Sequence, residues 1–224
     1  MTSPTSAILL AGGKSSRLGR DKARLKLCDG RTIIENTIQK LTMVSDEVIV
    51  VTNGRRYHHL EAKLVSDIYP GAGSLGGLYT GLLAAKSQHA LVVACDMPFL
   101  NLALLRYMIS LPRDYDVLIP KLGHKLEPLH AIYSQNCLQP IEELLKAGRF
   151  KILDFYDKVL VRYLPEGVIK RYDPDHRSFF NINTPDQLRE AQTITKRGFG
   201  GESFSDQGET KCDLLGGSAY DQDQ

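Results

Sequence analysis

The sequence predicts an α/β fold in which a mostly parallel sheet is covered by helices on both faces. The first observation is alternation: short apolar runs rich in β-branched residues are separated by segments of helical periodicity as far as residue 119. The second is that these runs are almost wholly apolar, as strands buried on both faces must be. Strand–helix alternation is typical of parallel sheets, and a chain of 224 residues fits one domain.

The predicted strands are short and are separated by turn or helix signals. Five belong to the alternating part of the chain: Ala7–Leu10, Glu47–Val51, Leu64–Val65, Ala90–Cys95 and Asp116–Ile119. A further strand is expected at Leu129–Tyr133, beyond the point where the alternation ends.

The first predicted helix begins with a capping box. The side chains of Thr32 and Glu35 can bond to backbone N–H groups that the first turn leaves unpaired. The apolar residues beside them have helical spacing: Ile33, Ile34, Ile38 and Leu41. Further helices are expected at Gly77–Lys86, Asn101–Leu111 and Gln139–Lys146.

The last part of the chain departs from the alternation. Arg177–Asn183 has the pattern of an extended segment. A helix then starts at Thr184, Pro185 and Gln187, because Thr can cap it, Pro suits the first helical position and Gln can complete the capping box.

Composition defines the expected domain organisation. From Gly198 onward the chain is rich in Gly, Ser, Asp and Gln and poor in apolar residues, so it cannot bury a core of its own. We therefore expect one domain over residues 1–196 and a disordered tail over 197–224.

Charge and cysteine usage exclude several functional classes. A formal net charge of +2 gives no reason to expect binding to nucleic acid or to a membrane surface. No apolar run approaches the roughly 20 residues of a membrane-spanning helix, and the first residues lack the features of a signal peptide. The four cysteines are too widely spaced for a disulfide framework. We therefore expect a cytoplasmic protein.

The most informative segment follows the first strand, where residues 10–22 read Leu-Ala-Gly-Gly-Lys-Ser-Ser-Arg-Leu-Gly-Arg-Asp-Lys. Gly12 and Gly13 let the backbone turn sharply and approach a ligand, and their N–H groups can cradle phosphate oxygens. Four cations lie in the same loop: Lys14, Arg17, Arg20 and Lys22. These features predict a triphosphate-binding site, with a solvated basic loop as the alternative.

Two common nucleotide motifs come close to matching. A P-loop needs a glycine five residues before Gly13, but Ile8 stands there. Residues 71–76 match the dinucleotide pattern Gly-x-Gly-x-x-Gly, and Asp96 follows at the end of the next predicted strand. However, residues 67–70 separate that pattern from the strand before it, and a dinucleotide site would leave the basic glycine loop without a role.

Four segments stand in an order that is specific when they are taken together. They are residues 10–22, Asp-Ile-Tyr-Pro-Gly-Ala-Gly-Ser-Leu-Gly-Gly-Leu at 67–78, Ala-Cys-Asp-Met-Pro-Phe-Leu at 94–100 and Phe-Asn-Ile-Asn-Thr-Pro at 180–185. With them the chain resembles the molybdenum cofactor guanylyltransferases, the MobA type of small nucleotidyltransferase. The resemblance covers residues 7–192, with Leu18 where the family usually has Met and Ser74 where it usually has Pro.

The resemblance implies a fold and a reaction. The fold is a Rossmann-like three-layer nucleotidyltransferase fold. The reaction transfers GMP from GTP to the phosphate of molybdopterin or Mo-molybdopterin, which forms the guanine dinucleotide cofactor and releases pyrophosphate. The resemblance also implies Mg²⁺ as the metal, and as partners other proteins of molybdenum cofactor biosynthesis or molybdoenzyme maturation.

The resemblance also assigns roles within the first loop. Leu10, Ala11 and Gly12 would lie against the guanine and the ribose. The leaving β- and γ-phosphates would be held by Gly13, Lys14 and Arg17, and Lys22 would reach the phosphates or the base edge. Arg17 and Lys22 are therefore expected to be catalytic, together with Asp96.

Asp96 is the candidate metal ligand because it follows a strand at the carboxyl edge of the sheet, where open α/β folds bind ligands. A single carboxylate suits Mg²⁺, which takes its other ligands from phosphates and water. The alternative is an aspartate that caps the next helix.

The remaining site candidates come from the resemblance, and most have a structural alternative. Asp67 and Asn53 are expected to contact the nucleotide, but both residue types are common in turns. Asn181 and Asn183 are expected to bind the pterin half of the acceptor, although Asn183 could instead cap a helix. Residues 127–130 are expected on the acceptor side.

Other functions remain open at this point. A relative on the same fold could use CTP for the same cofactor, or could act on a sugar phosphate. The two glycines after Leu-Ala favour guanine, and the small size argues against the larger sugar enzymes. A nucleotide-binding regulatory module without catalysis is the alternative from another class, which Arg17, Lys22 and Asp96 disfavour.

Overall fold

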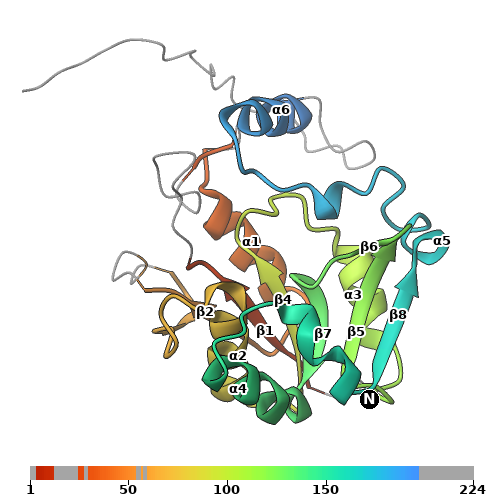
Figure 1. The fold of residues 1–224 in the computed structure, drawn as a ribbon. Helices are drawn as coiled ribbons and strands as arrows, with labels where there is room; N and C mark the ends of the chain where they lie inside the picture. The colour runs from red at the N-terminus through yellow and green to blue at the C-terminus, as the bar shows by residue number, and fades with distance from the viewer. Residues whose placement is uncertain (1–3, 13–24, 28–29, 54–56, 58–59, 197–224) are drawn as a thin grey trace, which may run out of the picture.

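A central sheet passes through the middle of the protein, with helices on both of its faces (Figure 1). The structure is a computed structural model, and it describes residues 4–12, 25–27, 30–53, 57 and 60–196. The predicted tail at 197–224 therefore lies outside the described residues.

The described strands form one sheet in the order β3-β2-β1-β4-β7-β5-β6, and β8 pairs with β5. Their bounds are β1 Ser6–Leu10, β2 Glu47–Val51, β3 Lys63–Val65, β4 His89–Ala94, β5 Val117–Leu122, β6 Lys125–Leu126, β7 His130–Ser134 and β8 Val161–Pro165. Strands β3, β2, β1 and β4 are mutually parallel, as are β5 and β8. Strand β7 is antiparallel to both β4 and β5, and β6 is antiparallel to β5.

The predicted strands are all present, and β6 and β8 are additional. Strand β6 has two residues, and β8 is half exposed except at Leu164, so neither produces an apolar run that the sequence alone would reveal. The mostly parallel sheet that the sequence predicts is confirmed for the N-terminal half of the chain.

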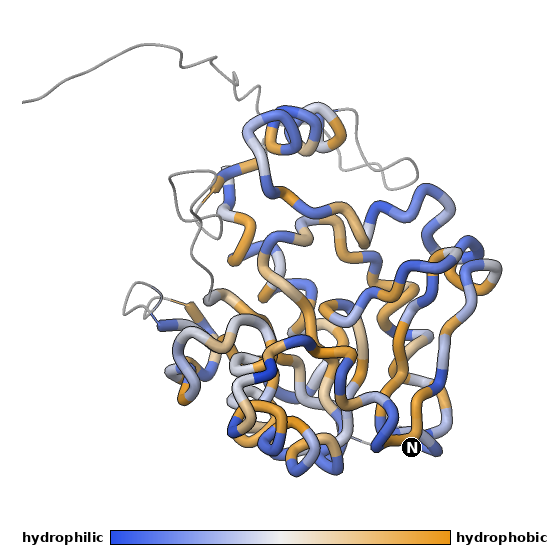
Figure 2. The backbone as a smooth tube through the Cα atoms, viewed as in Figure 1, coloured by the Kyte–Doolittle hydropathy of each residue, from blue (hydrophilic) through white to orange (hydrophobic). Residues whose placement is uncertain are grey.

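The helices cover the sheet in two layers. Their bounds are α1 Ile33–Thr42, α2 Gly73–Ala84, α3 Leu102–Ser110, α4 Leu138–Lys146, α5 Glu166–Ile169 and α6 Pro185–Lys196. One core joins Ala7 and Leu9 of β1 to α1 and α3, and a second joins Ile8 and Leu10 to α2 and α4. Successive side chains of β1 thus point to opposite faces, which explains why the whole strand is apolar. Figure 2 shows the apolar strands as orange segments in the centre.

The predicted capping signals are confirmed at two helices. At α1, the Glu35 N–H donates to Thr32 Oγ1 over 3.4 Å, and the Thr32 N–H donates to Glu35 Oε2 over 2.8 Å. At α6, Gln187 N donates to Thr184 Oγ1 over 3.2 Å, and Gln187 Oε1 accepts from Thr184 N over 3.1 Å. Local sequence therefore determines where both helices begin.

Two sequence expectations are wrong in detail. Helix α2 begins at Gly73, four residues earlier than expected, because Gly71 and Gly73 take positive φ values of 97° and 62° that complete the turn before the helix. The segment expected to be extended, residues 177–183, starts with a 3₁₀ turn at Arg177–Phe179.

No helix among the described residues has the length and apolar content that crossing a bilayer requires.

Helix α2 lies very close to the central strand because glycines face it. A Cβ atom at Gly81 would lie under 3.0 Å from the Ile8 side chain, and one at Gly77 would lie 3.3 Å from Leu10 Cδ2. These two glycines bring the middle and the C-terminal part of α2 close to β1.

We predict that Gly81→Ala lowers the free energy of unfolding by about 1–3 kcal/mol, because the added methyl group overpacks the contact with Ile8. Urea unfolding followed by circular dichroism measures the change. The control is Gly167→Ala in α5, where a Cβ meets nothing within 4 Å and the change should be neutral or stabilising. Equal stabilities for the two variants would contradict this account.

Candidate active site

The carboxyl ends of β1, β2, β3 and β4 meet at one edge of the sheet. Backbone hydrogen bonds continue past the strand ends: Ala11 N donates to Val51 O over 2.9 Å, and Cys95 N donates to Leu10 O over 3.1 Å. Thr52 N donates to Val65 O over 3.0 Å in the same way. The first residues after these strands are therefore fixed relative to one another before any side chain is considered.

Residues 10–12 form the start of the glycine-rich loop. Leu10 is buried against α2, and its carbonyl accepts from Cys95, so it positions the loop from within the core. Ala11 is half-buried and Gly12 is exposed. The other predicted residues of this loop, Gly13, Lys14, Arg17 and Lys22, lie outside the described residues, and their roles stay predictions.

Asp96 lies half-buried just beyond the end of β4. The alternative role, a cap on the next helix, is wrong, because α3 is capped by Asn101, whose Oδ1 accepts from Leu104 N over 3.0 Å. The main-chain carbonyl of Asp96 accepts from Ile182 N over 2.9 Å. Asp96 therefore lies where the sheet edge meets the segment that leads into α6.

Asp67 takes part in a turn and also binds a helix. Its Oδ1 accepts from Tyr69 N over 3.0 Å and from Thr80 Oγ1 over 3.1 Å. Thr80 Oγ1 in turn accepts from Ile68 N over 3.1 Å. The turn alternative is therefore what the structure shows, and a nucleotide contact by Asp67 stays a prediction. Sequence reasoning missed Thr80, because a buried helical threonine carries no signal of a partner 13 residues away.

Asn181 and Asn183 are brought to the same edge by Ile182, which lies between them and bonds to Asp96. The Asn181 side chain donates to Phe179 O over 3.0 Å, and Asn183 N donates to Gln187 Oε1 over 2.8 Å. Thr184 supplies the capping hydroxyl of α6, the task that the alternative gave to Asn183. Asn53 is exposed directly after Thr52 at the end of β2.

The turn at residues 127–130 lies beside the end of β4, because it leads into the neighbouring strand β7. Leu129 O accepts from Ala94 N over 3.1 Å, and Tyr133 Oη donates to Pro128 O over 2.7 Å. His130 is fully buried, and its ring centroid lies 4.8 Å from that of Phe179. Burial lowers the pKa of His130 to about 4, so its ring is neutral at physiological pH.

The donor set at this edge fits a cation that is held jointly with a substrate. Among the described residues, no group of three or more His, Cys, Asp and Glu side chains gathers into a protein-only metal site. Asp96 supplies one carboxylate at the carboxyl edge, which is the contribution that Mg²⁺ takes from proteins when phosphates and water supply the rest.

Enzymes with open α/β sheets bind nucleotides beyond the carboxyl ends of the parallel strands, where glycines and polar side chains gather. The described fold is that of a nucleotidyltransferase. The model of the MobA-like NTP transferase domain matches residues 7–159, and the chain belongs to this family.

Individual relatives cover most of the chain. A probable molybdenum cofactor guanylyltransferase of Peptoclostridium acidaminophilum is 38% identical over 199 residues, which are 85% of this chain and 90% of the relative. The molybdenum cofactor guanylyltransferase of Desulfosudis oleivorans is 38% identical over 193 residues, 85% of this chain and 96% of the relative. The crystal structure of molybdopterin-guanine dinucleotide biosynthesis protein A from Archaeoglobus fulgidus is 30% identical with a TM-score of 0.76, and the match covers 86% of this chain and 99% of that one.

We predict that acid destabilises the protein through His130. Its pKa falls from an ordinary 6.5 to about 4 in the folded state, so the unfolded state binds the extra proton first. The free energy of unfolding is therefore highest above pH 6.5 and decreases by roughly 3 kcal/mol as the pH falls towards 4. Urea unfolding between pH 7 and pH 4 measures the slope, and His130→Leu should flatten it. An unchanged slope in that variant would refute the assignment.

Proposed function

We propose that this protein transfers GMP from GTP to the phosphate of molybdopterin or Mo-molybdopterin and releases pyrophosphate. The observation that supports it best is the convergence at one sheet edge of residues 10–12, Asp96 and the Asn181–Asn183 segment, joined by the bond from Ile182 N to Asp96 O. The names of the similar proteins supply the nucleotide and the acceptor.

In the proposed reaction an acceptor phosphate oxygen attacks the α-phosphorus of GTP. The bond from that phosphorus to the oxygen bridging to the β-phosphate breaks, and pyrophosphate leaves with that oxygen. Such transfers depend mainly on positioning and on neutralising charge. We assign Leu10, Ala11 and Gly12 to the nucleoside, Gly13, Lys14, Arg17 and Lys22 to the phosphates, and Asn181 and Asn183 to the pterin.

Asp96 is proposed to hold the metal. Enzymes of this type generally use a divalent ion, and we propose Mg²⁺, which when bound would offset the charge on the phosphates. Asn53 and Asp67 are proposed to contact the nucleotide, Asp67 through the carboxylate oxygen that Tyr69 and Thr80 leave available.

The setting of the reaction is also part of the proposal. We propose one catalytic domain over residues 1–196, with a separate tail at 197–224, acting in the cytoplasm. Partners would be other proteins of molybdenum cofactor biosynthesis or molybdoenzyme maturation. The proposal involves neither nucleic acid nor a membrane.

We predict that GTP with Mg²⁺ raises the melting temperature more than CTP, ATP or UTP does. A ligand at 100 times its Kd stabilises the native state by about 2.7 kcal/mol, or roughly 5–10 °C for a domain of this size. Differential scanning fluorimetry with each nucleotide, with and without Mg²⁺, makes the comparison. A clear preference for CTP would instead favour a cytidylyltransferase.

We predict that Asp96→Asn lowers turnover by about 10²-fold or more without unfolding the protein, because an amide cannot replace a charged metal ligand. The assay follows pyrophosphate release from GTP with molybdopterin as acceptor. Asp114→Asn is the matched control, since Asp114 is 70% exposed and precedes β5 at the opposite edge of the sheet. Full activity of Asp96→Asn would remove Asp96 from the metal site.

A further inference from the structure

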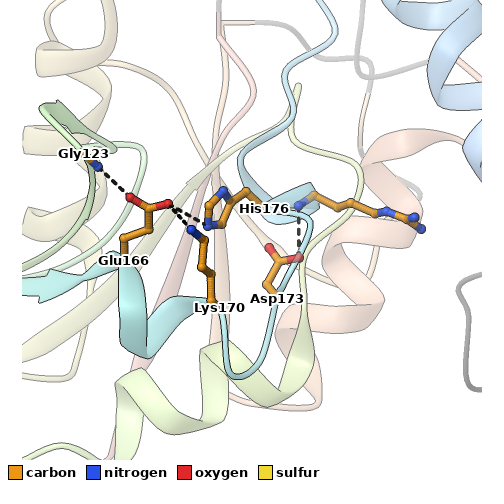
Figure 3. Close-up of polar contacts among 6 residues, drawn as sticks. Gly123, Glu166, Lys170, Asp173 and His176 are labelled. Carbon is orange, nitrogen blue, oxygen red and sulfur yellow. Dashed lines mark hydrogen bonds and ion pairs between the residues drawn. The ribbon is translucent and has the colours of Figure 1, made fainter.

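Residues 170–184, which we call the strap, connect α5 to α6 and carry both asparagines assigned to the acceptor. The strap has little regular structure beyond the 3₁₀ turn at Arg177–Phe179. Its position at the active-site edge therefore depends on the contacts that hold it. Figure 3 shows two carboxylates that make such contacts, Glu166 and Asp173.

Asp173 is the buried anchor of the strap. Asp173 is only 4% exposed. One of its carboxylate oxygens accepts from Arg177 N over 3.0 Å, and the other accepts from Ser178 N over 2.8 Å. The chain between Asp173 and Arg177 turns sharply at His176, whose φ is +54° and whose N–H donates to Asp173 O over 3.1 Å. One side chain thus closes the whole turn from 173 to 178.

The same turn is bonded to the beginning of α3. Asn101 N donates to Ser178 Oγ over 3.1 Å, and Asn101 Nδ2 donates to Tyr172 O over 2.8 Å. Asn101 also caps α3, and it lies five residues after Asp96 in one continuous segment. The strap is therefore attached to the Asp96–Asn101 segment at both of its ends, through Asn101 and through the Ile182–Asp96 bond.

Glu166 is the competing anchor, and it is weaker. It accepts from Gly123 N over 3.0 Å and pairs with Lys170 over 2.8 Å, and its Oε1 lies 3.7 Å from His176 Nε2 (Figure 3). The side chains of Glu166 and Lys170 are 33% and 55% exposed. Water and salt screen such a pair, whereas a buried carboxylate that loses a backbone N–H partner leaves that donor unsatisfied.

We propose that Asp173 is a positioning residue for the acceptor: it fixes Asn181 and Asn183 relative to Asp96 without touching the substrate. This inference rests on the proposed function for the identity of the acceptor. It predicts a selective effect, because the residues assigned to the nucleoside follow β1, β2 and β3, and none of the strap bonds described above reaches those strands.

The test compares Asp173→Asn with Asp175→Asn. Asn presents an NH₂ group to one of the two backbone N–H donors, so half of the anchor is lost while the volume stays the same. Asp175 lies in the same turn but is 65% exposed and pairs only with Arg177 among the contacts described, so it receives the identical chemical change. Steady-state kinetics with molybdopterin and GTP should show KM for molybdopterin raised at least about tenfold in Asp173→Asn, with KM for GTP within about twofold.

A second variant tests the same proposal in case Asp173→Asn does not fold. Ser178→Ala removes the hydroxyl that accepts from Asn101 N and leaves the Asp173 bonds in place, and it should shift the two KM values in the same selective way. Equal changes in both KM values, or none, in the folded variants would overturn the proposal.

Hydrogen exchange separates this inference from the proposed function. In Asp173→Asn the amides of Arg177, Ser178 and Ile182 should exchange faster than in the wild type and in Asp175→Asn, whether or not turnover is detected. No turnover by the wild-type protein would refute the proposed function alone. Unchanged protection of Ile182 would refute the positioning role alone.

Discussion

The structure depends on the double-sided burial of β1. This strand is hydrogen-bonded to β2 on one side and β4 on the other, and both of its faces are covered by helices. Because the three strands are parallel, their carboxyl ends and the loops that follow meet at one edge. The bonds from Ala11 to Val51 and from Cys95 to Leu10 extend this ladder into the loops themselves. The glycine-rich loop and Asp96 therefore start from positions that the sheet determines.

The side of the site that we assign to the acceptor is held in place differently. Beyond β4 the sheet continues through antiparallel β7, whose first residues lie at the same edge as the ends of the parallel strands. The strap then crosses this edge, held by polar contacts of the buried Asp173 and the half-buried Asn101 and by Phe179 against His130. The half of the site that we assign to the nucleotide is thus positioned by the parallel sheet, and the half that we assign to the acceptor by polar contacts of the strap.

Much of the fold follows from the sequence because its signals are local. The apolar runs, the Thr32–Glu35 box and the Thr184–Gln187 box each act within a few residues, and the structure confirms all of them. The start of α2 lies four residues before the predicted one, because the positive φ values of Gly71 and Gly73, which set the turn into the helix, leave no signal in the sequence. The sequence does not reveal strand β8, because it is half-exposed and, among the described strands, pairs with β5 alone.

The sequence by itself determined the α/β class, the starts of α1 and α6, the family resemblance and the carboxyl-edge location of Asp96, because these depend on periodicity, on short spacings and on motif order. Only the tertiary structure decided that Thr80 holds Asp67, that Asn101 rather than Asp96 caps α3, and that Asp173 anchors the strap. The bonds from Thr80 to Asp67 and from Asn101 to the strap join residues that are distant in sequence. Burial strengthens the Asp173 contacts above all, and burial is a property of the assembled fold rather than of any segment.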